Sequence, residues 1–384
     1  MKFFGYARED GSFGVRNYLL VMSTVSCANG VVNAIARSVA ESKAITHTEG
    51  CGRGPEDLAI ANRTLIGLGK NPNVGAVLII GLGCEFIRAD FLAEVLAQSK
   101  KPVEYLLIQK EGGSRKCIEK GIKIANQLWE KIKSQPREKA SWADLTLGLE
   151  CGGSDAMSGV SANPVVGVAS DWLVREGGRV ILSETTEMIG AEKILAQRAK
   201  NKEVAEQIIK LVERQKEIAK QFLGPFAGIS ITPGNIEGGL SSIVEKSLGC
   251  IIKAGSSQIN QVVEYGENAG EKGLVIMDTP GSDIFSMTAM VAGGAQIIVF
   301  TTGRGTPAGF PIAPVIKISS TTELFEKMRD DIDFDAGVVL SGKSIEQVGN
   351  DLIRLIQEVA NGKITKAEQN QQDIVAIHTT TPAF

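Results

Sequence analysis

The sequence predicts an α/β protein made of two doubly wound domains with mostly parallel sheets, followed by a C-terminal helical segment. Two observations lead to this class. Short β-branched runs alternate with longer helical stretches, and the runs are almost continuously apolar, as is typical of strands covered on both faces. In addition, the chain has 384 residues, whereas a single core stops growing at roughly 250–300 residues. We therefore expect at least two domains.

The first domain is expected to cover residues 1–138. Its strands are predicted at 17–25, 44–48, 74–82 and 103–108. Helical stretches are predicted at 29–41, 55–70, 87–99 and 114–134. Because each strand is followed by a helix, we expect neighbouring strands to run parallel.

The second domain is expected to cover residues 139–384, and a polar stretch with a proline at 133–142 is the candidate linker. Its strands are predicted at 145–149, 179–183, 274–278 and 296–301. A long charged helix at 191–222 interrupts them, and helical stretches at 321–330 and 344–361 follow. A polar tail begins at Ala367, for which we expect partial disorder.

Composition limits the possible partners and the compartment. The net charge of −3, with 43% hydrophobic and 22% charged residues, excludes a strongly basic surface, so nucleic acid is not an expected partner. The N-terminus has no apolar signal region, and the longest apolar runs fall short of the roughly 18 residues that span a bilayer. Six cysteines without tight pairing suit a reducing compartment, so we expect a cytoplasmic protein without membrane contact.

Cysteines follow several of the predicted strands, where open α/β sheets bind their ligands. The candidate metal ligands at these strand ends are Cys27, His47, Cys51, Cys84 and Cys151. Taken singly, each cysteine is better explained as a small buried residue, but this explanation is weaker for four cysteines at the same type of position, and no CxxC pair is present. Thiolates favour iron, zinc or an iron–sulfur centre, and neighbouring carboxylates extend the choice to mononuclear iron. His378 lies in the polar tail and is expected to be solvated.

Other strand ends and glycine turns carry side chains suited to a small anionic ligand. Arginine forks match carboxylates, and free amides at a helix start attract anions. The candidate substrate-binding residues are Arg8, Asp10, Arg16, Asn17, Arg115, Ser154, Thr302 and Arg304. A solvated arginine cluster, a helix cap at Ser114 or plain glycine turns would explain part of this pattern. No GxGxxG or GxxxxGK[ST] motif is present, so no nucleotide fingerprint is supported.

The ordered motifs resemble the altronate/galactarate dehydratase family. The motifs include GYAREDGSFGVRN, HTEGCG, GLGCE, CGGSDAMSGVSANP, ILSETTEMIGAE, MDTPG and FTTGRGT. The resemblance covers residues 5–310 strongly and continues more weakly through 333–337 and 361–368. It implies β-elimination from a 2-hydroxy acid, dependence on iron, and a small SAF-type domain ahead of this region in many members. Because this chain starts at the first motif, we expect that small domain on a separate subunit and this chain to be the large subunit.

The resulting expectation is a hydro-lyase large subunit that dehydrates a sugar acid such as altronate to a 2-keto-3-deoxy acid, within an oligomer. A metal at the cysteines would act as Lewis acid, with arginines as clamps. The candidate acid and base residues are Asp155, Glu184 and Asp278. Two alternatives stay open. One is the large subunit of a (2R)-sulfolactate sulfo-lyase, which expels sulfite, and the other is a non-catalytic scaffold that binds a sugar acid.

Overall fold

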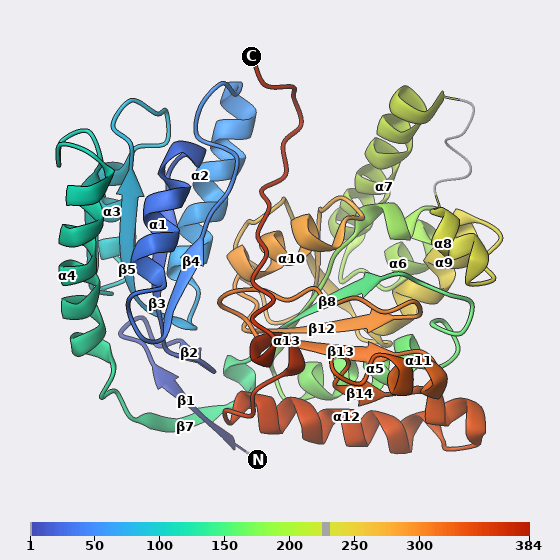
Figure 1. Ribbon diagram of the computed structural model, residues 1–384. Helices are drawn as coiled ribbons and strands as arrows, with labels where there is room; N and C mark the ends of the chain where they lie inside the picture. Colours follow the sequence, from blue (N-terminus) through green and yellow to red (C-terminus); the bar gives the residue numbers. More distant parts are fainter. Residues whose placement is uncertain (1, 225–230) are drawn as a thin grey trace.

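The computed structural model describes residues 2–224 and 231–384 and shows two units of sheet and helices side by side (Figure 1). The first unit contains a parallel sheet in the order β4-β3-β5-β6. Its strands are β3 (Tyr18–Ser23), β4 (Ser42–Ile45), β5 (Val74–Gly81) and β6 (Val103–Leu107). Every residue of β3 and β5 is buried, which explains why the sequence shows these strands as continuous apolar runs.

Helices cover both faces of this first sheet. One face packs against α1 (Asn29–Ala36) and α4 (Ser114–Ile132), and the other against α2 (Pro55–Lys70) and α3 (Ala89–Ala97). Alternate residues of β3 therefore enter different cores, with Val21 on the α1 side and Leu20 on the α2 side. The predicted doubly wound arrangement of this unit is confirmed.

The second unit contains a seven-stranded parallel sheet in the order β10-β11-β9-β8-β12-β13-β14. Its strands are β8 (Thr146–Gly152), β9 (Arg179–Leu182), β10 (Ile259–Val263), β11 (Gly273–Met277), β12 (Ile297–Thr302), β13 (Val315–Ser319) and β14 (Phe334–Asp335). The sequence predicted β8, β9, β11 and β12 and missed the other three. The missed β10 and β14 lie at the two edges and are only partly buried, so they lack a continuous apolar run.

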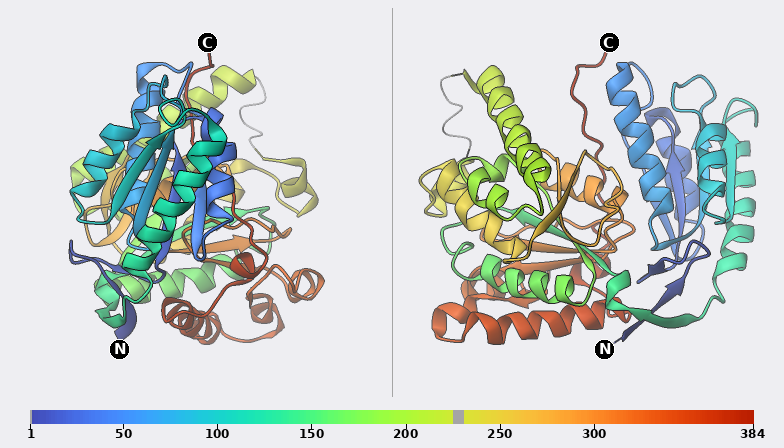
Figure 2. Two further views of the ribbon diagram at one scale, coloured as in Figure 1. Left: turned by 60° about the vertical axis from the view of Figure 1, so that its left-hand side comes forward. Right: turned by 180° about the vertical axis from the view of Figure 1, so that it is seen from behind.

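The helices of the second unit also form two layers. One layer holds α5 (Ala162–Arg175) and α12 (Ile345–Ala360), which lies along the base of the molecule (Figure 2). The opposite layer holds α10 (Asp283–Ala292), which packs on α2 of the first unit, so Met290 and Leu65 share one core. The remaining helices are α6 (Glu192–Gln197), α7 (Lys202–Leu223), α8 (Pro233–Glu237), α9 (Ile243–Cys250), α11 (Thr322–Lys327) and α13 (Lys366–Gln369).

Two expectations about the middle of the chain need correction. The single helix predicted at 191–222 is two helices, because α6 ends at Gln197 and the Asn201 side chain caps a new helix by accepting from Val204 N. The candidate linker at 133–142 holds β7 (Arg137–Ser141), which pairs antiparallel with β1 (Lys2–Ala7) beside the short β2 (Phe13–Gly14). No helix in the described parts of the chain has the length and apolar character that crossing a membrane requires.

The C-terminal tail is ordered, contrary to expectation, and rises between the two units (Figure 1). The His378 ring is not free in solvent, because it packs against Tyr265 and Phe285 with ring centroids 5.6 and 5.9 Å away. Further along, Thr380 N and Thr381 N donate to the Asp57 carboxylate at 2.6 and 3.1 Å. These contacts compensate for the polar composition that suggested disorder.

Replacing Asp57 with asparagine is expected to release this tail. The neutral side chain has only one acceptor oxygen, and hydrogen bonds to a charged group contribute about 1.5–3 kcal/mol. Hydrogen–deuterium exchange over residues 378–384 should accelerate, while exchange in β8 should stay unchanged. The matched control is Glu56→Gln on the exposed neighbouring position, and equal exchange in both variants would contradict the role of Asp57.

Candidate functional site

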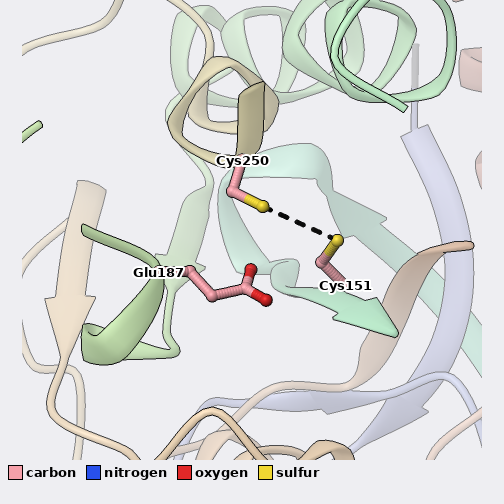
Figure 3. Close-up of side chains that lie close together, drawn as sticks. All are labelled: Cys151, Glu187 and Cys250. Carbon is pink, nitrogen blue, oxygen red and sulfur yellow. Dashed lines mark hydrogen bonds between the residues drawn. The ribbon is translucent and has the colours of Figure 1, made fainter. Parts of the chain in front are cut away.

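Acidic, thiol and amine side chains converge on the carboxyl edge of the second sheet. Glu150 and Cys151 lie near the end of β8, and Glu184 follows β9. The other members come from 3-10 turns and a helix end: Glu187 from Thr185–Met188, Cys250 from the end of α9, and Lys253 from Ile251–Ala254. All six are buried. Figure 3 shows Cys151, Glu187 and Cys250 pointing toward one another from three different elements.

Local backbone geometry places these groups. The turn after β8 needs glycine because a Cβ at Gly152 would collide with the Asp283 carboxylate and the Phe300 ring, and Gly153 has φ +58°. Glu184 adopts the left-handed conformation with φ 65°, which costs about 1–3 kcal/mol for a residue other than glycine. Its N–H donates to Thr279 Oγ1 at 2.7 Å, so the neighbouring strand end holds this strained conformation in place.

Lys253 is the positive centre of the cluster. Its Nζ lies 3.0 Å from Glu184 Oε2 and 3.6 Å from Glu187 Oε2. Lys246 adds a second ammonium at 2.7 Å from Glu187 Oε1. Burial alone would lower the pKa of Lys253, but the charges of Glu184, Cys151 and Glu187 raise it well above the ordinary value. Lys253 is therefore a fixed cation surrounded by acidic groups.

Glu150 and Glu184 form a coupled carboxyl pair. Burial, followed by repulsion from Glu184 and Asp283, raises the pKa of Glu150 well above its ordinary value. Burial, followed by repulsion from Glu187, raises the pKa of Glu184 to about 8. The two carboxyls contact each other, and among the described residues no other group donates a hydrogen bond to either oxygen of Glu150 or to Oε1 of Glu184. Such unsatisfied buried carboxyls are typical of groups that exchange protons with a ligand.

The thiols of Cys151 and Cys250 lie 3.8 Å apart. The hydrogen bond from Cys250, together with the charge of Lys253 and a contact with Ser154, lowers the pKa of Cys151 to about 7. Ser154 Oγ lies 2.8 Å from the Cys151 sulfur. The Cys151 thiol therefore ionises more readily than an ordinary thiol, whereas the pKa of Cys250 is raised by that same hydrogen bond and by burial.

Donor atoms for a metal ion are present at this place. One atom each from Cys151, Glu187 and Cys250 lie within 4.8 Å of one another. Glu187 Oε2 has no hydrogen-bond partner in the described parts of the chain. Two sulfurs and a carboxylate oxygen are a donor set that iron accepts, so the residues present fit such an ion.

A cavity of about 250 Å³ opens beside the cluster. Ser154, Asp155, Lys246 and Cys250 belong to its lining. The exposed Arg304 lies at the end of the neighbouring strand β12 and pairs with Glu237 at 2.6 Å. A small acid that enters this cavity meets the Lys246 ammonium and the Cys250 thiol.

The predicted metal ligands are not brought together as one set. Cys27, Cys51 and Cys84 are exposed at strand ends of the first sheet, and within the described residues the metal donor set around Cys151 does not include them. His47 is buried and uses both ring nitrogens, since Nε2 lies 2.9 Å from Ser23 O and Nδ1 accepts from Glu49 N at 3.1 Å. The prediction combined strand ends from two different sheets. Each sheet has its own carboxyl edge, so these side chains do not meet at one place.

The predicted acid, base and clamp residues of the second unit lie around the cluster. Asp155 accepts from Ser158 N, Ser158 Oγ and Ser320 Oγ, so it shapes the turn. Asp278 accepts from Thr185 Oγ1 at 2.6 Å and pairs with Arg214, which holds the turn that carries Glu184. Thr302 accepts from Gly305 N. Glu184 alone among the three predicted acid–base residues belongs to the buried cluster.

The predicted anion clamps of the first unit have other partners. Arg8 donates to Pro72 O at 2.7 Å and to Asn17 at 2.9 Å. Arg16 pairs with Glu368 at 2.7 Å. Asp10 accepts from Ser12 N, and Arg115 is exposed at the start of α4. These residues hold the chain together or face solvent, and the structure does not bring them to the cluster.

The Arg16–Glu368 pair is expected to make stability depend on acid pH. Burial would raise the pKa of Glu368, but the hydrogen bonds and charge of Arg16 lower it below 4.5. The stabilisation is complete above pH 4.5 and is lost as the pH falls through the lowered pKa of the folded state. In acid unfolding followed by circular dichroism, Glu368→Gln should reduce the slope below pH 4.5 by up to about 1.4 kcal/mol per pH unit. The exposed Glu358→Gln is the control, and an unchanged slope in Glu368→Gln would contradict the expectation.

Sequence reasoning missed Glu150, Glu187, Cys250 and Lys253. Two signals were available. Glu150 stands inside an apolar strand and Lys253 follows the apolar run CII, and a charge in such surroundings is almost never fully buried unless it is paired. That these two charges meet depends on the sheet order, which the sequence does not show.

An α/β fold with a buried cluster of carboxyl, amine and thiol groups at a sheet edge indicates that the protein is an enzyme. Residues 5–133 match the family domain described as D-galactarate dehydratase/Altronate hydrolase, second domain, and residues 142–383 match D-galactarate/Altronate dehydratase, C-terminal. The chain belongs to this dehydratase family.

Curated relatives match along nearly the whole chain. The altronate dehydratase of Bacillus subtilis is 38% identical over 387 residues, which cover 98% of this chain and 77% of the relative. The galactarate dehydratase (L-threo-forming) of Escherichia coli is 36% identical over 382 residues, covering 94% and 73%. The (2R)-sulfolactate sulfo-lyase subunit beta of Chromohalobacter salexigens is 32% identical over 369 residues, covering 95% and 94%.

Proposed function

We propose that this chain is a sugar-acid hydro-lyase that removes water from a 2,3-dihydroxy acid such as altronate or galactarate. The dehydratase relatives that match over most of their length support this assignment. The observation that carries it in the structure is the buried Glu150–Glu184 pair beside the Lys253 ammonium. This is the combination of acid, base and positive charge that elimination next to a carboxylate requires.

The proposed reaction removes the proton from C2 and expels the hydroxyl group from C3. Glu184 takes the C2 proton, because its pKa of about 8 makes it a stronger base than an ordinary carboxylate. Glu150 holds its proton more tightly and donates it to the leaving hydroxyl, which departs as water. Lys253 stabilises the negative charge that develops on the substrate carboxylate. The enol product then tautomerises to the 2-keto-3-deoxy acid.

Iron is the proposed cofactor, with Cys151, Cys250 and Glu187 as its ligands. This set keeps one residue of the predicted group and adds two. When bound, iron supplies Lewis acidity toward the substrate carboxylate or the departing oxygen. Metal analysis after anaerobic purification tests this assignment, with Cys250→Ser expected to lose iron and Cys27→Ser expected to retain it. Equal iron content in both variants would refute these ligands.

A separate small subunit is the proposed partner. The relative that this chain covers over 94% of its length is by its name a subunit, which supports an enzyme assembled from more than one polypeptide. We infer a subunit with an SAF-type domain and an oligomeric enzyme in the cytoplasm, where the six free cysteines stay reduced.

Turnover assays test the function directly. The purified chain, alone and mixed with a candidate small subunit, would be given altronate, galactarate and (2R)-sulfolactate under anaerobic conditions with Fe²⁺. Formation of a 2-keto-3-deoxy acid is the expected result. Sulfite release instead would favour the sulfo-lyase alternative. The 32% identity to a (2R)-sulfolactate sulfo-lyase subunit is the observation that supports this alternative. Binding of a sugar acid without any turnover would support the hypothesis of a non-catalytic scaffold and refute the proposed hydro-lyase activity.

A further inference from the structure

One cavity lies between the two units, at the amino edge of the second sheet. Its volume is about 530 Å³. Its lining includes the first residues of two strands, Thr146 of β8 and Arg179 of β9. The opposite wall comes from the last turns of α2 and from the β1–β2 turn at Asp10. The catalytic cluster lies at the carboxyl edge of the same strands, so this seam cavity is a different place.

Positive side chains dominate the seam cavity. Arg63, Lys70, Arg179 and Lys272 line it, against two carboxylates. Both carboxylates are already engaged by the backbone, since Asp10 accepts from Ser12 N and Asp144 accepts from Ser141 N, each at 2.9 Å. Within residues 2–224 and 231–384, none of the four cations forms an ion pair.

The helix ends at this cavity do not account for the surplus charge. Cations often compensate the carbonyl groups at a helix C-terminus. At the end of α2, however, the buried Lys101 already donates to Gly69 O, Lys70 O and Asn71 O at 3.1, 2.9 and 2.7 Å. At the end of α10, the Asn71 side chain donates to Val291 O and Ala295 O. The cations that line the cavity are additional to these caps.

Two of the cations also lie close enough to repel each other. In the part of the chain that the structure describes, Arg179 donates only to neutral groups, namely Glu271 O, Gly270 O and Thr146 Oγ1. Burial and the charge of Arg179 lower the pKa of Lys272. Like charges without ion-pair partners around a partly open cavity favour a negatively charged ligand that relieves their repulsion.

We propose that the seam cavity binds a small polyanion, a compound with phosphoryl or several carboxylate groups, at a site separate from the catalytic cluster. Arg63 and Lys70 reach the ligand from the first unit, and Arg179 and Lys272 reach it from the second. The bound polyanion therefore bridges the two units and stabilises their packing through α2 and α10.

Inorganic pyrophosphate and citrate are the probes. Isothermal titration with the full chain at low salt should show one site for at least one of them, with affinity falling as ionic strength rises. Binding of pyrophosphate alone would point to a phosphoryl ligand, and binding of citrate alone to a polycarboxylate. The melting temperature of the protein should rise in the presence of each probe that binds.

Variants locate the site. The double variant Arg63→Gln/Lys70→Gln removes two charges from exposed and half-buried positions and should weaken binding at least about tenfold. Lys343→Gln/Arg354→Gln, which removes two charges from the region of α12, should bind like the unmodified chain, as should Glu184→Gln in the catalytic cluster. Absence of binding by both probes, or equal loss in the two double variants, would overturn the proposal. Loss of binding in Glu184→Gln would assign the probes to the catalytic site and overturn it as well.

Discussion

Replacing Glu184 with glutamine is expected to lower kcat by about 10²–10⁴-fold, the usual contribution of a general base. Glutamine keeps the size of the side chain but cannot accept a proton at neutral pH. Lys253 keeps Glu187 as an ionic neighbour at 3.6 Å, so the buried ammonium is not left unpaired. Thermal unfolding should therefore show a folded protein, and KM should change far less than kcat.

The matched control for this experiment is Glu271→Gln. Glu271 is an exposed carboxylate that pairs with Lys200 at 2.6 Å on the protein surface, and its loss should leave kcat unchanged. Activity of Glu184→Gln within about threefold of the unmodified enzyme would remove Glu184 from the reaction. A loss of activity together with a loss of the cooperative unfolding transition would show a structural role instead of the proposed one.

The sheets were the most predictable part of this molecule. Strands buried on both faces, such as β3 and β5, are visible in the sequence because nearly every residue is apolar. The buried helix α10 was missed for the same physical reason, since DIFSMTAMVA is apolar around most of its circumference and shows little helical periodicity. Helix α5 was also missed, and its Pro164 lies in the first turn, where proline is tolerated.

Residues of the candidate site were predictable only where a single turn after a strand contains several polar side chains. ECGGSD pointed to Cys151 and Ser154, and SETTE pointed to Glu184. The partners Cys250 and Lys253 lie about a hundred residues along the chain from Cys151, in a helix end and a 3-10 turn. Their approach to β8 is set by how α9 packs against the turn that carries Glu187, and local periodicity holds no information on such long-range packing.

Arg16 shows how a plausible anion clamp can instead be a structural residue. Its guanidinium pairs with both oxygens of Glu368 at 2.7 and 2.9 Å. It also donates to Val359 O and Lys363 O at 3.0 and 2.8 Å. All these partners belong to the C-terminal region, so one buried arginine joins the first unit to the end of the chain.

Replacing Arg16 with methionine should therefore lower the free energy of unfolding by about 3–5 kcal/mol, the typical cost of leaving one member of a buried ion pair alone. Denaturant unfolding of the full chain measures this loss. Arg115→Met, at an exposed position on α4, should stay within about 0.5 kcal/mol of the unmodified protein. If Arg16→Met instead raised KM for the sugar acid and left the unfolding curve unchanged, the result would support the substrate-binding role that the sequence predicted for Arg16. The geometry argues against that outcome, because every nitrogen of this guanidinium already has a partner within the protein.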